Sequence, residues 1–142
     1  MISNPKHGWC SFNMGNFEGN PSYLTDVPLD LLDAFINYFK IGYGVVVFDE
    51  EVTSFTLVLE KYNSNIFIIE EREERLLHIF DNLVVKNLVE ELVDDIENDI
   101  DKWSDFITSD NVEDIQHHKE DLIQRLGTLK KLFRLNFAER IG

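Results

Sequence analysis

The sequence predicts one α+β domain over residues 1–142: an antiparallel meander of about four strands, one helix before it and two or three helices after it. Three observations predict this class. Apolar residues recur at helical spacing between residues 29 and 39, three strand-like segments follow at hairpin spacing, and helical spacing returns from residue 85 onward. A length of 142 residues fits a single domain, and a 44% hydrophobic composition excludes intrinsic disorder.

The first 42 residues contain a predicted strand, a loop and a helix. Residues 9–14 alternate between apolar and polar, which predicts a strand alongside the meander. Residues 15–21 are rich in Gly, Asn and Pro and are predicted to form a loop. Thr25 or Asp26 can cap the helix that follows, and Gly42 is placed to end it.

The meander itself is predicted from three apolar segments. Residues 44–48 are apolar and rich in valine, residues 55–60 alternate, and residues 66–69 follow a turn at 62–65. The alternation is typical of a sheet that buries one face and exposes the other to solvent. We therefore expect the following helices to cover one face of this sheet.

The second half is predicted to be helical. From about Glu73 to Ile107 there is no Pro or Gly, so one or two helices are expected, including one strongly amphipathic helix over residues 85–107. Its apolar residues share one face, and carboxylates coat the opposite one. Those carboxylates are Glu90, Glu91, Asp94, Asp95, Glu97, Asp99, Asp101 and Asp105. Asp110 and Glu113 have the spacing of a capping box for a last helix, which Gly127 is expected to bend or end.

Charge is distributed unevenly along a chain whose net charge is −14. Residues 90–121 hold 13 acidic residues against two lysines, whereas residues 125–140 hold five basic residues and one acidic residue, Glu139. The acidic face is either a solvated surface partly paired with the basic tail or a surface that binds a basic partner. A second acidic cluster, Asp49, Glu50 and Glu51, either forms a turn or reaches into a basic cleft. Direct binding of nucleic acid or an anionic membrane is excluded by like charge.

No catalytic or cofactor motif is present, so the chain is predicted not to be an enzyme and to bind no cofactor or metal. The acidic run from Asp95 to Asp101 lacks the glycine of a calcium loop. The four histidines are expected to be exposed or locally hydrogen-bonded, and the single cysteine, Cys10, to be buried. The lone thiol and the lack of a signal peptide or a membrane span favour a cytoplasmic location.

Two segments resemble the immunity proteins of bacterial polymorphic toxin systems, including those of contact-dependent growth inhibition. They are residues 16–32, NFEGNPSYLTDVPLDLL, and residues 46–51, VVFDEE, and the resemblance extends over about the first 70 residues. It implies a small cytoplasmic protein that binds the C-terminal toxin domain of a cognate effector. Many such toxins are nucleases with basic clefts, so the expected partner is a basic nuclease domain.

Charge geometry selects the candidate partner-binding residues, which are the eight helix carboxylates together with Asp49, Glu50 and Glu51. Two alternatives stay open. One is a non-catalytic adaptor or structural module, with a homodimer through the sheet edge as one form. The other is an enzyme or metal protein that uses its acidic residues.

Overall fold

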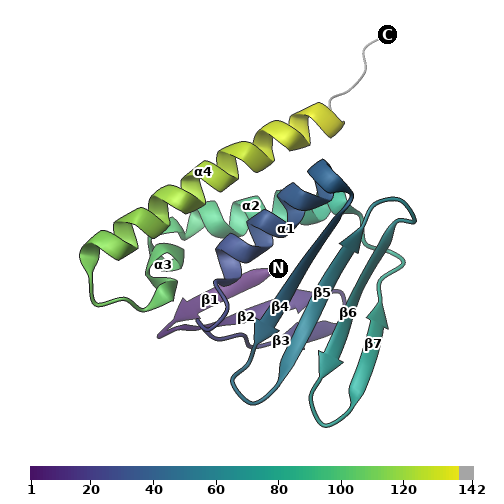
Figure 1. The fold of residues 1–142 in the computed structure, drawn as a ribbon, viewed down its shortest axis with the longest axis horizontal. Coiled ribbons are helices and arrows are strands. Elements are labelled where there is room, and N and C mark those ends of the chain that lie inside the picture. The colour runs from purple at the N-terminus through teal and green to yellow at the C-terminus, as the bar shows by residue number, and fades with distance from the viewer. Residues whose placement is uncertain (138–142) are drawn as a thin grey trace.

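The computed structural model describes residues 1–137 and contains two antiparallel sheets and a group of helices (Figure 1). The first sheet, sheet A, comprises β1 (Ile2–Lys6), β2 (Trp9–Met14) and β3 (Phe17–Gly19). The second, sheet B, comprises β4 (Tyr43–Asp49), β5 (Ser54–Glu60), β6 (Asn65–Glu71) and β7 (Arg75–Ile79). The helices are α1 (Val27–Ile41), α2 (Val85–Asn98), α3 (Ile100–Ser104), a 3-10 turn η1 (Asp105–Ile107) and α4 (Val112–Phe137).

The predicted α+β class is confirmed, and so is the four-stranded meander, but its fourth strand is a different one. Residues 9–14 do not lie alongside the meander. The fourth strand is β7, in a region predicted to be helical, and it carries His78. The charged turn at residues 72–74 lacks Gly, Pro and Asn, so no residue type marked the hairpin.

Sheet A forms from residues predicted to be a strand and a loop. Strand β2 lies between β1 and β3, with Phe12 opposite both Ile2 and Gly19. The expected loop over residues 15–21 is wrong at β3, because Gly15 (φ 57°) and Asn16 alone make the turn. A two-residue hairpin turn needs a residue that tolerates positive φ, and the strands pair directly on either side of it.

Helix α1 begins and ends where the sequence predicted. Of the two proposed caps it is Asp26 that accepts a hydrogen bond from the backbone N–H of Leu29. Thr25 instead binds the edge of β4: its hydroxyl accepts from the N–H of Asp49 at 2.8 Å and donates to the Val47 carbonyl at 3.1 Å. Gly42 ends the helix in the left-handed conformation, at φ 91°.

The core lies between sheet B and the elements that cover its inner face. Helix α1 packs so closely on β4 that a Cβ at Gly44 would lie 2.0 Å from the carbonyl oxygen of Ala34. Sheet A packs on the same face, where the ring of Phe12 lies 4.9 Å from that of Phe48 and 5.2 Å from that of Phe55. Helix α4 lies across α1 and α2 (Figure 1).

The predicted single helix over residues 85–107 is wrong, because the chain breaks at Asp99. The N–H of Asp99 bonds to Ile96, and the carbonyl of Asp95 accepts from the indole N–H of Trp103 at 3.0 Å instead. The indole therefore satisfies the carbonyl that a continuing helix would have bonded, and Trp103 becomes fully buried.

Helix α4 is capped by a different residue from the one predicted and does not end at Gly127. Asn111, not Asp110, caps it, since its side-chain oxygen accepts from the N–H of Glu113 at 2.9 Å. Gly127 neither ends nor interrupts the helix, which continues to Phe137. Glu139 and Arg140, counted in the basic tail, lie outside the described residues. None of the helices in the described part of the chain is long and apolar enough to cross a membrane.

Candidate functional site

The eight helix carboxylates do not form one continuous surface. Five lie on α2, Asp99 lies at the break, Asp101 lies on α3 and Asp105 begins η1. The break turns the last three away from the axis of α2. The predicted acidic face is therefore divided between two helical segments and a turn.

Two of these carboxylates hold the first strand. Glu91 and Asp95 both bind the Met1 amine, and Asp95 also accepts from the N–H of Ile2 at 3.1 Å. Burial alone would lower the pKa of the amine, but its hydrogen bonds to both carboxylates outweigh burial and raise the pKa. Glu91 and Asp95 are therefore already paired within the chain, where they join β1 to α2.

Two more helix carboxylates pair with lysines of α4. Glu97 accepts from Lys130 at 2.7 Å, and Asp101 accepts from Lys119 at 2.8 Å. Both pairs are largely solvent-exposed, so each contributes at most about 1 kcal/mol to stability. An approaching cation can compete for such pairs at little cost.

Four helix carboxylates have no ion-pair partner within residues 1–137, namely Glu90, Asp94, Asp99 and Asp105. All four are exposed. Glu90 and Asp94 border a groove of about 290 Å³ between α2 and α4, whose other side carries Lys130, Phe133 and Arg134. The groove has cations on its far wall, so the surface is acidic only on its α2 side.

The predicted acidic cluster at residues 49–51 is divided in its roles. Glu50 accepts two hydrogen bonds from Arg72, both at 3.1 Å, and one from the N–H of Asn20 at 2.9 Å. Its side chain is only 9% exposed. Burial alone would raise the pKa of Glu50, but these bonds outweigh burial and lower it. Glu50 is therefore bound within the fold and is not available to a partner. Asp49 and Glu51 lie at the turn, where the Asp49 carboxylate accepts a hydrogen bond from the N–H of Glu51 at 2.6 Å.

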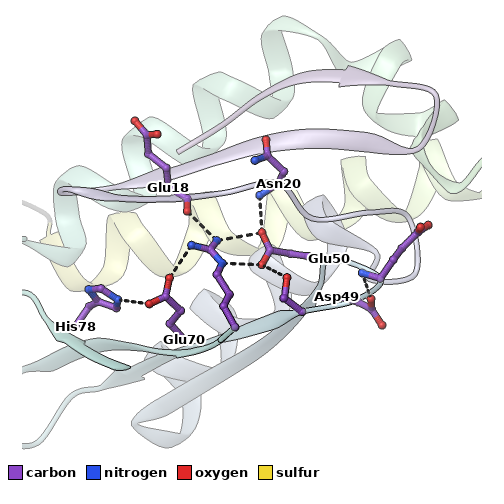
Figure 2. A network of polar contacts seen from close by, with 9 residues as sticks. Glu18, Asn20, Asp49, Glu50, Glu70 and His78 are labelled. Atoms are coloured by element: carbon purple, nitrogen blue, oxygen red, sulfur yellow. Dashed lines mark hydrogen bonds and ion pairs between the residues drawn. The ribbon is translucent and has the colours of Figure 1, made fainter. Parts of the chain in front are cut away.

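Arg72 is the centre of a network that joins the two sheets (Figure 2). It donates to Glu70 at 2.6 Å and to the carbonyl of Glu18 on β3 at 2.9 Å, and its guanidinium lies 5.1 Å from the centre of the Phe17 ring. Glu70 also lies 3.3 Å from the ring nitrogen of His78. Both carboxylates of this cluster are therefore held by one guanidinium inside the fold, which is typical of a structural connection.

The outer face of sheet B, turned away from the core, is apolar apart from Thr56. We use "outer face" for two rows of residues that the strand register brings side by side. One row consists of Val47, Thr56, Ile69 and Leu77, and the other of Val45, Val58, Phe67 and Ile79. Val47, Leu77 and Ile79 are 59%, 60% and 62% exposed. No element within residues 1–137 covers these rows.

Sequence reasoning missed this face by expecting one side of the sheet to be polar. The signal was present in residues 44–48 and 66–69, which are apolar without alternation. Such runs are typical of strands that are buried on both faces. In the described fold only the inner residues of these strands are buried, among them Val46 and Ile68.

His118 and Cys10 are both buried. His118 is buried and lies 2.8 Å from both the Ser104 carbonyl and the Asp26 carboxylate, thereby linking α4 to α3 and α1. Burial alone would lower the pKa of His118, but Asp26 outweighs it and raises the pKa. Cys10 is buried as predicted, and burial raises the pKa of its thiol to about 12. Among the residues described, no group of three or more His, Cys, Asp or Glu side chains could hold a metal ion.

No family model, no curated protein and no solved structure matches this chain.

Proposed function

We propose that this chain is a non-catalytic protein that captures a basic partner protein, and that the partner is a cognate toxin domain that it neutralises in the cytoplasm. The observation that carries the proposal is the set of exposed carboxylates, Glu90, Asp94, Asp99 and Asp105, with no ion-pair partner in the described chain. Such groups remain available to lysines and arginines of another protein. The resemblance of residues 16–32 and 46–51 supports the narrower assignment to an immunity protein.

The proposed mechanism is electrostatic and steric. Carboxylates of the chain pair with the lysines and arginines that the toxin uses to hold nucleic-acid phosphates, and the bulk of the domain blocks the cleft. Complementary charge accelerates such encounters by about 10- to 10³-fold at low salt. Lasting protection calls for a dissociation constant of about 1 nM or less, which is about −12 kcal/mol. Exposed charges alone do not reach that value, so buried apolar contacts must contribute.

Coexpression with the C-terminal domain encoded by the reading frame immediately upstream tests the proposal. We expect this chain to restore growth and to elute with that domain as one complex from a sizing column. Undiminished toxicity together with separate elution would reject the proposal.

A charge-reversal pair tests the electrostatic part. Glu90→Lys with Asp94→Lys is expected to weaken binding about 10-fold or more at low salt and to flatten its salt dependence. Glu18→Lys with Glu120→Lys changes the net charge equally on other surfaces and serves as the control. Equal losses in both pairs would mean that only the net charge matters.

The edge of sheet B favours a second candidate, a homodimer formed by strand pairing. The β4 edge is occupied near Asp49 by Ser22 and Thr25, but β7 pairs only with β6 in the described fold. An open edge strand with exposed Leu76 and Leu77 is a template for another strand. Sedimentation that shows a monomer at high micromolar concentration would reject this candidate.

A further inference from the structure

The outer face of sheet B is a contiguous, solvent-exposed apolar surface. Single exposed apolar side chains are ordinary, but here two neighbouring rows extend over all four strands. At about 4.8 Å between strands and about 7 Å between side chains on one face, the rows cover a few hundred Å². The largest apolar patch on a monomeric protein is of about this size and is often functional.

Acidic residues border this face at one end. The β4–β5 and β6–β7 turns lie at the same end of the sheet, because Asp49, Ser54, Glu71 and Arg75 are aligned across the four strands (Figure 1). We call the carboxylates of this end the acidic rim, which consists of Asp49, Glu51, Glu71, Glu73 and Glu74. The cations at this end are Arg75, which pairs with Glu71 at 3.6 Å, and Arg72, which Glu50 and Glu70 already hold. The rim therefore keeps a negative charge.

An apolar centre with a charged border is the usual anatomy of a protein interface. A stable complex buries about 800 Å² on each partner, which is more than the two apolar rows supply. The rim must therefore take part in the contact. Its carboxylates require cations on the other side, since burial of unpaired charge is costly.

We infer that the outer face of sheet B is the docking surface for the partner, and that it binds an apolar patch bordered by lysines or arginines. This inference rests on the proposed function, because it names the surface through which the basic partner is held. The outer face supplies the apolar contacts, and Asp49 and Glu51 meet the partner's cations. The exposed carboxylates of α2 lie at the groove between α2 and α4, away from this face, and act on the partner by long-range attraction during the encounter. Glu50 takes no part, because Arg72 already holds it.

A second copy of this chain fits the surface less well than a basic partner. Face-to-face packing of two copies needs cations opposite each acidic rim. Close to the outer face, the described chain offers only Arg75, already paired with Glu71, and Lys61 at the far end of the sheet. Two surfaces with the same excess of carboxylates repel one another.

Matched substitutions on the two sheets test the inference. Val47→Arg with Leu77→Arg places two charges on the outer face of sheet B. Ser11→Arg with Asn13→Arg places the same two charges on the outward side of β2 in sheet A. The probe is the purified C-terminal domain encoded immediately upstream, and its affinity for each variant is measured by calorimetry after circular dichroism has shown equal folding.

We expect the sheet B pair to weaken binding by about 100-fold or more and the sheet A pair by less than about 3-fold, as for hot-spot and peripheral positions. Val45→Thr with Val47→Thr keeps shape and charge, and is expected to weaken binding about 10-fold through lost apolar burial alone. This second variant also covers the case in which the arginine pair does not fold.

The outcomes separate the two proposals. If the unaltered chain does not bind the probe, the proposed function and this inference both fail. If it binds and the sheet B variants bind within about 3-fold of it, only the docking surface is wrong. A dimer of the unaltered chain that Val45→Thr with Val47→Thr dissociates would instead identify a second copy as the occupant, and would overturn the inference.

Discussion

The two sheets bury their inner faces in one core but present different outer faces. In sheet A the outward positions include Ser3, Ser11, Asn13 and Glu18, as expected for a solvated surface. In sheet B the corresponding positions carry two apolar rows across all four strands. Since both sheets are stabilised by the same core, the apolar outer face of sheet B is not explained by folding. The difference separates residues that hold the fold together from residues available to a partner.

The largest expected effect contrasts the inner and outer faces of sheet B. Phe55 stacks on Phe48 with ring centres 4.6 Å apart and is fully buried, so Phe55→Ala is expected to lower the free energy of unfolding by about 3–5 kcal/mol. Val47→Ala, on the outer face, is expected to lower it by less than about 1 kcal/mol. Urea unfolding of both variants measures the contrast, and equal losses would mean that the outer face is part of the core.

Loss of the Arg72 network between the two sheets is expected to have the next largest effect on the free energy of unfolding. Arg72→Ala leaves Glu50 and Glu70 without their cation and is expected to cost about 2–3 kcal/mol, less than a fully buried pair because Arg72 is partly exposed. The pKa of Glu50 is lowered in the fold, so its contribution is present at neutral pH and is lost as pH falls through that lowered pKa. The cost of Arg72→Ala should therefore shrink in acid. A cost that does not change between pH 7 and pH 3 would contradict the assigned pairing.

Substitution of His118 is expected to lower the free energy of unfolding by less, and with the opposite pH dependence. Its pKa is raised by Asp26, so the pair stabilises the fold fully below the ordinary histidine pKa, and the contribution is lost as pH rises through the raised pKa. His118→Gln is expected to cost about 1–2 kcal/mol more at pH 5.5 than at pH 9. Thermal unfolding at both pH values checks this, with His117→Gln, an exposed neighbour, as the control. The same cost at both values would mean that His118 is neutral in the fold.

The smallest effect compares the two outer faces in the absence of a partner. Val45→Thr with Val47→Thr on sheet B, and Ser11→Thr with Asn13→Thr on sheet A, are each expected to change the free energy of unfolding by less than about 1 kcal/mol. An apolar dye such as ANS should bind less to the sheet B variant and equally to the sheet A variant. Unchanged dye binding by the sheet B variant would show that its outer face is not an accessible apolar surface.

Elements with an uninterrupted local pattern could be predicted from the sequence. Helix α1 was predicted to within a residue or two, because Asp26 and Gly42 mark its ends. Strands β4, β5 and β6 were found because their apolar runs are separated by turn residues. Strand β7 was missed because nothing in residues 72–74 signals a hairpin.

Features that depend on distant contacts could not be predicted. The helix breaks at Asp99 because the indole of Trp103 takes the Asp95 carbonyl, which only the folded chain brings together. Glu50 looked like an exposed turn residue, yet Arg72 holds it. The acidic helix residues were predicted to share one face, but the break at Asp99 divides them, and Glu91 and Asp95 bind the Met1 amine.

Docking of a partner on the outer face of sheet B should be visible at the side chains of that face. Methyl NMR of this chain, titrated with the C-terminal domain encoded upstream, tests it most directly. We expect the methyl signals of Val45, Val47, Leu77 and Ile79 to shift on binding. Shifts confined to Val93 and its neighbours on α2, with the four outer-face signals unchanged, would contradict it.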